Sequence, residues 1–236
     1  MLWSSSRVMN NLAYRLTTFL VTIYIRITCR IDAPEMHKFP MKGPLIVISN
    51  HTGQIEVPAL FALLQPRKFT GWAKIETWDN WFLNWVFNVW GIIPIRRGEA
   101  DTSALRKAME ALDKEMIFGI APEGTRNKTG RLLRAYPGAV LLAVRSGVPI
   151  LPVAHWGGEV YMKNLKRIKR TDFHLRVGER FRLKVDGVRM SKEVRQQIAD
   201  EMMYRVAELM PQEYRGAYEK APEGMGTFTE TIKTQS

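Results

Sequence analysis

The sequence predicts an α/β protein with a mostly parallel central sheet covered by helices, preceded by an N-terminal membrane-associating helix. Apolar β-branched runs alternate four or five times with segments of helical periodicity, which is the pattern of consecutive strand–helix–strand units. The length of 236 residues and the apolar content of 46% suit one such domain with a substantial core. We therefore divide the chain into an N-terminal helix at 1–30, a domain at 31–215 and a flexible polar tail at 216–236.

The N-terminal segment combines basic and apolar character. Residues 1–30 contain four arginines and no acidic residue, and the uncharged run 16–25 lies between two of these arginines. That run is about half as long as a helix that spans a bilayer, so we expect it to lie in the membrane interface. The alternative is a helix packed on the domain with its arginines in water.

Within the domain, turn residues and changes of hydrophobic period separate the expected elements. Strands are expected at 44–48, 69–74, 91–97, 116–121, 148–154, 173–177 and 181–185, with the last two paired to each other. Helices are expected at 57–64, 78–90, 101–114, 139–144 and 190–210. Because the strand at 148–154 holds two prolines, we expect it near an edge of the sheet, followed by a buried or capping His155.

The helix expected at 78–90 is almost uncharged. Its asparagines stand at every fourth position, 80, 84 and 88, and make one narrow polar stripe on an apolar surface. Such a helix is either buried nearly all round or faces lipid, and its tryptophans suit the membrane interface.

A polar corner at 49–56 joins the first strand of the domain to its first helix. The corner places His51 at the carboxyl end of the strand, where open α/β sheets build their sites, and Glu56 five positions later in the first helical turn. A carboxylate bound to one ring nitrogen fixes the tautomer of an imidazole and leaves the other nitrogen free as a base. The alternative is that Glu56 closes a capping box opened at Gly53, with His51 as an ordinary loop residue.

The net charge of +12 favours polyanionic partners, such as anionic lipid surfaces, phosphorylated substrates or nucleic acid. Five cations and no acid fall within 163–170, but this run lacks the interleaved aromatic residues that stack on bases, so we expect no nucleic acid partner. The single cysteine, Cys29, excludes an internal disulfide and leaves little scope for a zinc site, so we expect no metal.

Four blocks stand in one order along the chain: Asn50-His51 through Glu56, Gly91 through Arg97, Pro122 through Arg126, and Val148 through Val153. Together they resemble the motifs of the glycerolipid acyltransferases typified by lysophosphatidic acid acyltransferase. Those motifs are a His-x-x-x-x-Asp corner, a Gly-x-Ile-x-x-x-Arg strand, a Pro-Glu-Gly-Thr-Arg turn and a Val-Pro-Ile-x-Pro-Val strand. The resemblance spans residues 44–155, and the chain departs from it at Glu56, where the family usually has aspartate.

The resemblance implies an O-acyltransferase of phospholipid biosynthesis. Such an enzyme moves an acyl chain from acyl-CoA or acyl carrier protein to the free hydroxyl of a lysophospholipid, here first of all lysophosphatidic acid. His51 is then the general base, oriented by Glu56, and because no Ser or Cys stands at a nucleophile elbow we expect direct transfer without an acyl-enzyme. No cofactor is expected beyond the thioester co-substrate. The residues expected to bind substrate are Lys74, Arg96, Arg97, Glu123, Gly124, Thr125 and Arg126.

The expected partners are therefore an anionic membrane surface, a lysophospholipid acceptor, and acyl-CoA or acyl carrier protein. We expect a peripheral or monotopic protein at the cytoplasmic face of the inner membrane. Because Glu56 replaces the usual aspartate, an acyltransferase for another lysolipid or for an amino-acid-derived acceptor stays open. A more distant alternative is a non-catalytic protein that binds lipid or nucleic acid.

Overall fold

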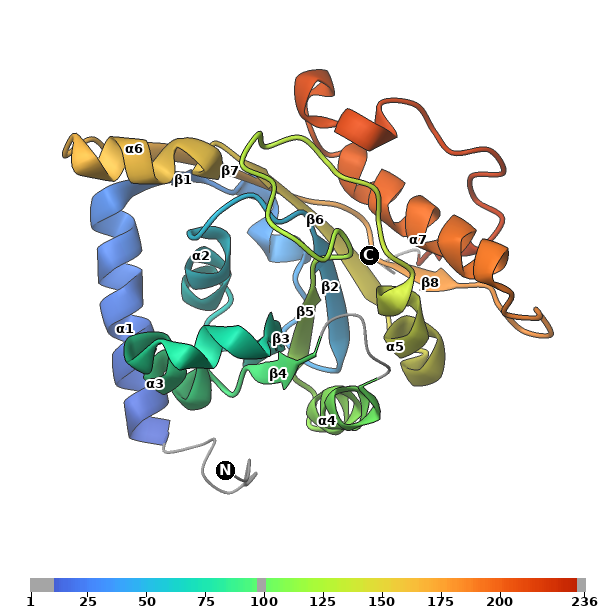
Figure 1. Cartoon of the computed structure of the whole chain (residues 1–236), viewed down its shortest axis with the longest axis horizontal. Coiled ribbons are helices and arrows are strands. Elements are labelled where there is room, and N and C mark those ends of the chain that lie inside the picture. Colours follow the sequence, from blue (N-terminus) through green and yellow to red (C-terminus); the bar gives the residue numbers. More distant parts are fainter. Residues whose placement is uncertain (1–10, 97–100, 233–236) are drawn as a thin grey trace.

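The computed structural model describes residues 11–96 and 101–232, which form helices around one mixed sheet (Figure 1). The strands of these residues are β1 (Cys29–Asp32), β2 (Leu45–Ser49), β3 (Phe69–Lys74), β4 (Ile93–Ile95), β5 (Ile117–Ile120), β6 (Ile150–Trp156), β7 (Thr171–Val177), β8 (Phe181–Leu183) and β9 (Thr229–Thr231). The α-helices are α1 (Asn11–Thr28), α2 (Glu56–Leu63), α3 (Trp81–Trp90), α4 (Thr102–Asp113), α5 (Gly138–Ser146), α6 (Tyr161–Lys166) and α7 (Lys192–Ala207). Short 3-10 helices are η1 (Pro34–Lys38), η2 (Ile75–Asp79), η3 (Gly158–Val160), η4 (Gln212–Tyr214) and η5 (Gly216–Tyr218).

The sheet is mostly parallel, which confirms the predicted fold class. Its main order is β1-β7-β6-β2-β5-β3-β4, with β8 paired to β6 and β9 paired to β8. β2 is parallel to both β5 and β6, and β3 is parallel to both β5 and β4, whereas β7 is antiparallel to β6. The loops that follow these parallel strands therefore gather at one edge of the sheet.

Helices cover both faces of the sheet and bury two apolar layers (Figure 1). In β2, Ile46 and Ile48 face the layer that includes α4, α5 and α7, while Leu45 and Val47 face the layer that includes α2 and α3. All four side chains are 0% exposed. This burial on both faces is the reason why the strand reads as a continuous apolar run instead of alternating with polar residues.

The strand expected near an edge, β6, lies inside the sheet between β2 and β7, so that prediction is wrong. The expected pairing of β7 with β8 is also wrong, because each of them pairs antiparallel with β6 instead. β8 pairs with β6 at Ile150, and β7 pairs with it from Val153 onward. Pro152 lies between these two points, opposite the bend at 178–180 where the chain passes from β7 to β8. A residue without an amide hydrogen is tolerated there because the ladder is interrupted.

The N-terminal helix α1 packs on the domain and keeps an apolar face exposed. Thr17, Thr18 and Ile25 are buried, and the Trp90 indole of α3 donates a hydrogen bond to the Thr18 hydroxyl at 3.3 Å. Seven large apolar side chains of α1 are 40–75% exposed: Leu12, Leu16, Phe19, Leu20, Ile23, Tyr24 and Ile27. Among the described residues, none of the helices combines the length and the hydropathy needed to cross a bilayer.

The helix α3 is not buried all round. Val86 and Trp90 are buried, whereas more than half of the surface is exposed in Trp81, Phe82 and Trp85. The asparagine stripe is used locally, since Asn80 accepts two backbone amides at the start of the helix and Asn88 accepts the Trp78 indole. One edge of α3 therefore belongs to the core and the other is an exposed aromatic surface.

The C-terminal segment, which the sequence assigns to a flexible tail, packs on the domain from 216 to 232. β9 pairs with β8, and Tyr218 and Phe228 are buried. The cause is Glu201 of α7, a fully buried carboxylate that accepts the Phe228 amide at 3.2 Å and the Thr229 hydroxyl at 3.0 Å. These partners are 27 and 28 positions from Glu201, so the sequence pattern does not reveal the contact.

Candidate active site

Two turns meet at the carboxyl edge of the sheet. The polar corner at 50–56 follows β2, and the turn at 121–127 follows β5. The two turns lie side by side because β2 and β5 are parallel neighbours whose pairing continues to Ile48 and Ile120.

His51 and Glu56 form the contact that the sequence predicts. Nδ1 of His51 lies 2.6 Å from Oε1 of Glu56, and because a carboxylate only accepts, the ring donates from Nδ1. The same Oε1 accepts the Gly53 amide at 3.0 Å, but α2 begins at Glu56 with Ile55 as its N-cap, so Gly53 does not open a capping box. The carboxylate therefore fixes the ring tautomer and the corner backbone together, and Nε2 of His51 keeps its lone pair.

Glu56 is a buried, ionised carboxylate. Its residue is 2% exposed, and Oε2 has no hydrogen-bond partner among the described residues. Burial by itself raises the pKa of Glu56, but the hydrogen bond from His51 and the nearby imidazoles of His155 and His51 outweigh it and lower the pKa from 4.5 to about 2. Glu56 thus carries its negative charge throughout the neutral pH range.

Glu123 holds the backbone of the corner. It is 1% exposed, and its two oxygens accept the His51 amide and the Leu133 amide, each at 2.9 Å. Asn127 completes the link by donating its amide to the His51 carbonyl at 2.8 Å. The pKa of Glu123 is raised to about 7. Burial is the main cause and the charge of Glu56 adds to it, while the two amide hydrogen bonds act in the opposite direction. Both oxygens of this carboxylate are therefore engaged by backbone groups of the protein itself.

Arg126 lies beside the unprotonated nitrogen of His51. Its Nε donates to Nε2 of His51 at 3.4 Å, and the side chain is exposed. The bend that delivers Arg126 contains Gly124 at a φ of +64°, where an added Cβ meets Cδ2 of Tyr136 at 3.2 Å. Thr125 is exposed between them. The arrangement places an exposed cation in hydrogen-bond contact with the ring nitrogen that Glu56 leaves without a proton.

The other cations expected at the site lie on the same edge, farther along the sheet. Lys74 is the last residue of β3, the strand next to β5, and Arg96 follows β4, the strand beyond β3. Both side chains are exposed. Arg97 lies outside the described residues. Arg96 lines a pocket of ≈ 230 Å³ with Ile75, Pro94, Asp101, Ser103, Ala104 and Lys107. The structure thus brings His51, Glu56, Glu123 and Arg126 together and leaves Lys74 and Arg96 on the neighbouring strands.

Asn50 and His155 form a latch that the sequence analysis missed. The Asn50 amide group donates to the His155 carbonyl at 2.7 Å and its oxygen accepts the His155 amide at 3.0 Å, while Nε2 of His155 donates to the Asn50 carbonyl at 2.7 Å. His155 is 0% exposed, which confirms the expected burial, and that burial lowers the pKa of its imidazole. The asparagine before His51 was the available signal, but its partner on β6 is 105 positions away.

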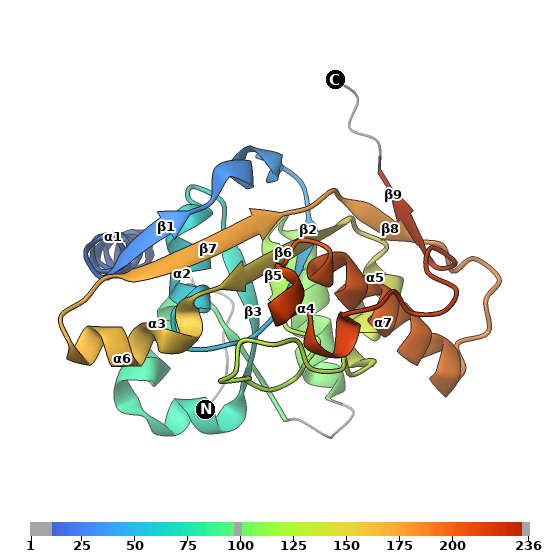
Figure 2. The same ribbon diagram turned by 90° about the horizontal axis from the view of Figure 1, so that it is seen from above.

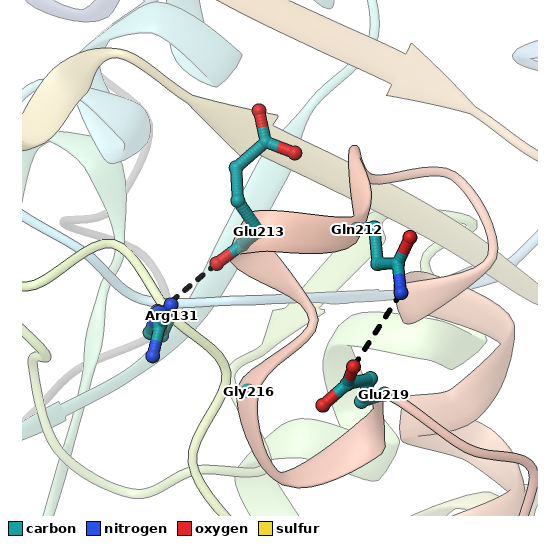
Figure 3. Close-up of a pocket in the computed structure, with 5 residues that line it drawn as sticks. All are labelled: Arg131, Gln212, Glu213, Gly216 and Glu219. Atoms are coloured by element: carbon teal, nitrogen blue, oxygen red, sulfur yellow. Dashed lines mark hydrogen bonds between the residues drawn. The ribbon is translucent and has the colours of Figure 1, made fainter.

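A surface pocket lies between the segment after β5 and the C-terminal 3-10 helices. It has a volume of ≈ 350 Å³ and is lined by Arg131, Gln212, Glu213, Gly216 and Glu219 (Figure 3). Nε of Arg131 donates to the Glu213 carbonyl at 3.0 Å, and Nε2 of Gln212 lies 3.4 Å from Oε1 of Glu219. The pocket therefore contains none of the groups that meet at His51. In the same described ranges, no three His, Cys, Asp or Glu side chains gather in the manner of metal ligands.

Comparison with known proteins gives one family. The profile of the Acyltransferase family matches residues 30–156. The chain is 30% identical over 131 residues to a chloroplastic 1-acyl-sn-glycerol-3-phosphate acyltransferase of Brassica napus, covering 54% of this chain and 38% of that protein. It is 32% identical over 127 residues to the alpha enzyme of the same name from Homo sapiens, with 52% and 44% coverage. The corresponding protein of Borreliella burgdorferi is 28% identical over 139 residues, with 58% and 55% coverage.

A solved structure shows the same fold. The 1-acyl-sn-glycerophosphate (LPA) acyltransferase PlsC of Thermotoga maritima superposes with a TM-score of 0.60 at 21% sequence identity, over 85% of this chain and 83% of that one. The matches to the curated relatives span about two fifths to just over half of the length of each relative.

Proposed function

The chain belongs to the Acyltransferase family, and from this membership we propose that it transfers an acyl chain from a thioester to the free hydroxyl of lysophosphatidic acid, giving phosphatidic acid. The observation that carries the proposal is the 2.6 Å contact of His51 with Glu56, with Arg126 beside the free ring nitrogen. The names of the relatives support the choice of acceptor. The donor is acyl-CoA or acyl carrier protein, with no further cofactor.

His51 is the general base of this proposal. Because Glu56 is ionised and accepts from Nδ1, Nε2 of His51 takes the proton of the acceptor hydroxyl while the hydroxyl oxygen attacks the thioester carbonyl. The ester bond forms, the carbon–sulfur bond breaks, and the leaving thiolate receives the proton from the imidazolium. Glu56 stabilises that imidazolium during the transfer, and positioned general-base catalysis of this kind contributes about 10²–10⁴-fold to the rate.

Arg126 is the phosphate ligand of the proposal. Its guanidinium is 3.4 Å from Nε2 of His51, so a phosphate held on this planar fork places a neighbouring glycerol hydroxyl within reach of the base. Gly124 and Thr125 shape the turn that presents Arg126. Lys74, at the end of β3, and Arg96, after β4, extend the positive rim on the same edge toward the acceptor. Arg97 is proposed as a substrate ligand from its place in the sequence motif alone.

Glu123 acts through the backbone in this proposal. By accepting the amides of His51 and Leu133 it ties the corner after β2 to the segment after β5. The distance between base and phosphate ligand then depends on a contact that is itself buried and rigid. Glu123 is therefore a positioning residue.

A membrane surface is the proposed meeting place of enzyme and acceptor. The exposed apolar side chains of α1 and the exposed aromatic residues of α3 belong to two helices that contact each other, and the chain carries a net charge of +12. Anionic headgroups attract such a charge, and interfacial helices bury such apolar faces. The acceptor then enters from lipid and the donor from water. We place the protein at the cytoplasmic face of the inner membrane, as a peripheral or monotopic protein.

The test is acyl transfer by the purified chain. Labelled lysophosphatidic acid is offered with acyl-CoA and with acyl carrier protein thioesters of several chain lengths, and labelled phosphatidic acid is measured. His51→Ala is expected to lose at least about 10²-fold in kcat. His37→Ala, which changes an exposed histidine on η1, is the matched control and is expected to keep full activity. Unchanged turnover in His51→Ala would falsify the assignment of the base.

The same assay separates the alternative acceptors. Glu56 in place of the family's aspartate keeps other lysolipids open, so lysophosphatidylcholine and an amino-acid-derived lysolipid are offered in parallel. If kcat/KM is larger for either of them than for lysophosphatidic acid, that lysolipid is the acceptor instead. The proposed role of His51 in the transfer is then unchanged.

A further inference from the structure

The turn between α6 and β7 presents one isoleucine to the outside. Ile168 is 97% exposed, the highest exposure among the large apolar side chains of the described residues. It also has a φ of +53°, a backbone conformation that β-branched residues rarely adopt. An apolar side chain in a strained and fully exposed position gives the folded protein no packing in return. The outlier therefore points to a role outside the folded chain.

The strained conformation is held in place by the turn around it. The Asn164 carbonyl accepts the amides of both Arg167 and Lys169, at 2.9 Å each, and the Ile168 amide donates to the Leu165 carbonyl at 3.0 Å. The Asn164 side chain in turn donates to the Thr171 hydroxyl at 3.1 Å. These hydrogen bonds fix the backbone of the turn and hold Ile168 in its exposed conformation.

Cations surround this tip. Lys163, Lys166, Arg167, Lys169 and Arg170 lie within eight consecutive residues that contain no acid. The nearest acid along the chain, Asp172, is 3.4 Å from Arg30 and so is paired with another cation. Leu165, the other apolar residue of this segment, packs on the core, so Ile168 is the exposed apolar residue among these cations. This combination matches the surface of an anionic bilayer, with headgroups outside and acyl chains beneath.

The tip is fixed to the exposed helix α1. The Arg170 guanidinium donates to the carbonyls of Arg26 at 2.9 Å and Cys29 at 2.5 Å, and the Tyr161 hydroxyl donates to the Tyr24 hydroxyl at 2.5 Å. Both views show the turn after α6 at the outer end of the molecule on the side of α1 (Figures 1 and 2). The segment that carries Ile168 is therefore fixed to the C-terminal end of α1, where Ile23 and Ile27 are exposed.

We propose that residues 163–170, the end of α6 and the turn that follows it, form a membrane-inserting tip, in which Ile168 enters the interface of an anionic bilayer while the neighbouring cations contact lipid headgroups. The inference deepens the proposed function, because it names the lipid surface from which the acceptor is taken. A bilayer fits better than an acidic partner protein, since the tip adjoins the long apolar face of α1. The occupant is a phospholipid bilayer rich in negatively charged headgroups.

Binding to vesicles tests the tip. Vesicles of phosphatidylglycerol with phosphatidylcholine, and of phosphatidylcholine alone, are sedimented with the full chain. Ile168→Asn is expected to lower partitioning into the anionic vesicles roughly tenfold, because it removes the one aliphatic side chain that is proposed to enter the bilayer. Its melting temperature is expected to stay equal or rise, since Asn tolerates positive φ. The charge variant Lys166→Gln/Lys169→Gln is expected to lose about fivefold per cation at low salt. Unchanged partitioning in Ile168→Asn overturns the proposal.

Two matched controls lie on other elements. Leu141→Asn removes an exposed apolar residue from α5, and Lys184→Gln/Lys192→Gln removes two exposed cations beyond β8 and on α7. Both are expected to bind vesicles like the wild type. If these controls lose as much binding as the tip variants, adsorption is unspecific and the proposal is overturned.

Depth measurement locates the tip directly. Ile168→Cys is labelled with an environment-sensitive fluorophore, and the wild-type chain, whose one thiol is the buried Cys29, is expected to take up no label under the same conditions. A blue shift on anionic vesicles and quenching by lipids brominated near the headgroup support insertion, while a label that stays in water overturns it. If Ile168→Asn or the charge variant keeps vesicle binding but loses binding to acyl carrier protein, the segment binds a protein and the membrane proposal is overturned. Vesicle binding without any acyl transfer leaves the tip standing and removes the proposed function.

Discussion

Oε1 of Glu56 accepts two hydrogen bonds from one corner of the chain, from Nδ1 of His51 at 2.6 Å and from the Gly53 amide at 3.0 Å. The imidazole contact and the backbone contact, which the sequence presents as alternatives, are therefore made by the same carboxylate oxygen, although the N-cap of α2 is Ile55 and not Gly53. The hydrogen bond from the Gly53 amide fixes the backbone of the corner, and the hydrogen bond from Nδ1 of His51 fixes the ring with Nε2 on the side of Arg126. Substitutions of Glu56 separate the two roles. The Gly53 amide needs only an oxygen acceptor at position 56, whereas the His51 imidazolium needs a negative charge there.

Glu56→Gln is expected to keep much of the fold and lose most of the activity. The amide oxygen still accepts the Gly53 amide, but without the negative charge the imidazolium of His51 loses its stabilisation, so kcat is expected to fall by about 10²-fold or more. Glu56→Asp keeps the charge and is expected to retain part of the activity. The measurement is kcat with lysophosphatidic acid, together with thermal melting. Equal rates for wild type and Glu56→Gln would mean that Glu56 serves only as the acceptor of the Gly53 amide.

Arg126→Gln is expected to act on the acceptor. The guanidinium next to Nε2 of His51 is proposed to bind the phosphate, so its loss raises KM for lysophosphatidic acid by about tenfold, in line with one charge-assisted contact. KM for the acyl donor is expected to stay constant. Lys128→Gln, an exposed cation two positions away, is the control. An equal rise of both KM values contradicts a phosphate role and indicates a general disturbance of the turn.

Local contacts of the site could be predicted from the sequence, and distant ones could not. His51 and Glu56 are five positions apart on a strand–turn–helix corner, so their contact follows from local geometry. Arg126 is 75 positions from His51, and only the order of the motifs and the parallel sheet bring the two to one edge. The use of Glu123 on two backbone amides needs coordinates, because nothing in a motif says whether a carboxylate faces substrate or its own chain.

The wrong predictions have a common physical cause. Pro152 argued for an edge strand, but the ladder beside it breaks where β7 bends into β8, so an interior strand accommodates the proline. The polar segment after 216 argued for a free tail, but the buried carboxylate of Glu201 binds it. In both cases a distant partner overrides a local preference. The mostly parallel α/β fold was predictable because many elements agree on it.

Asn50→Ala is expected to destabilise the protein. It removes the side-chain partners of the amide and the carbonyl of the fully buried His155, which costs about 2–4 kcal/mol of unfolding free energy. Activity is expected to fall as well, because Asn50 immediately precedes His51. The measurement is urea denaturation. Asn88→Ala, which changes an exposed asparagine of α3, is the control and is expected to cost less than about 0.5 kcal/mol. Equal losses of unfolding free energy in the two variants would mean that the hydrogen bonds between Asn50 and His155 do not stabilise the protein more than those of a surface asparagine.

Glu123 is expected to make the fold less stable as the pH rises toward neutrality. Its pKa of about 7 in the folded protein lies above the ordinary 4.5, so the folded chain keeps a proton that the unfolded chain releases. The unfolding free energy therefore falls between pH 4.5 and 7, by at most about 3 kcal/mol, and is level above pH 7.

The difference between wild type and Glu123→Gln isolates this effect. His155 acts in the opposite direction, because burial lowers the pKa of its imidazole and the folded form gains stability as the unfolded histidine loses its proton. Both proteins share that contribution, and the lowered pKa of Glu56 acts only between about 2 and 4.5. Urea denaturation from pH 5 to 8 is expected to show a wild-type curve that descends relative to that of Glu123→Gln up to pH 7. Parallel curves would mean that Glu123 is ionised throughout, held in that state by the amides of His51 and Leu133.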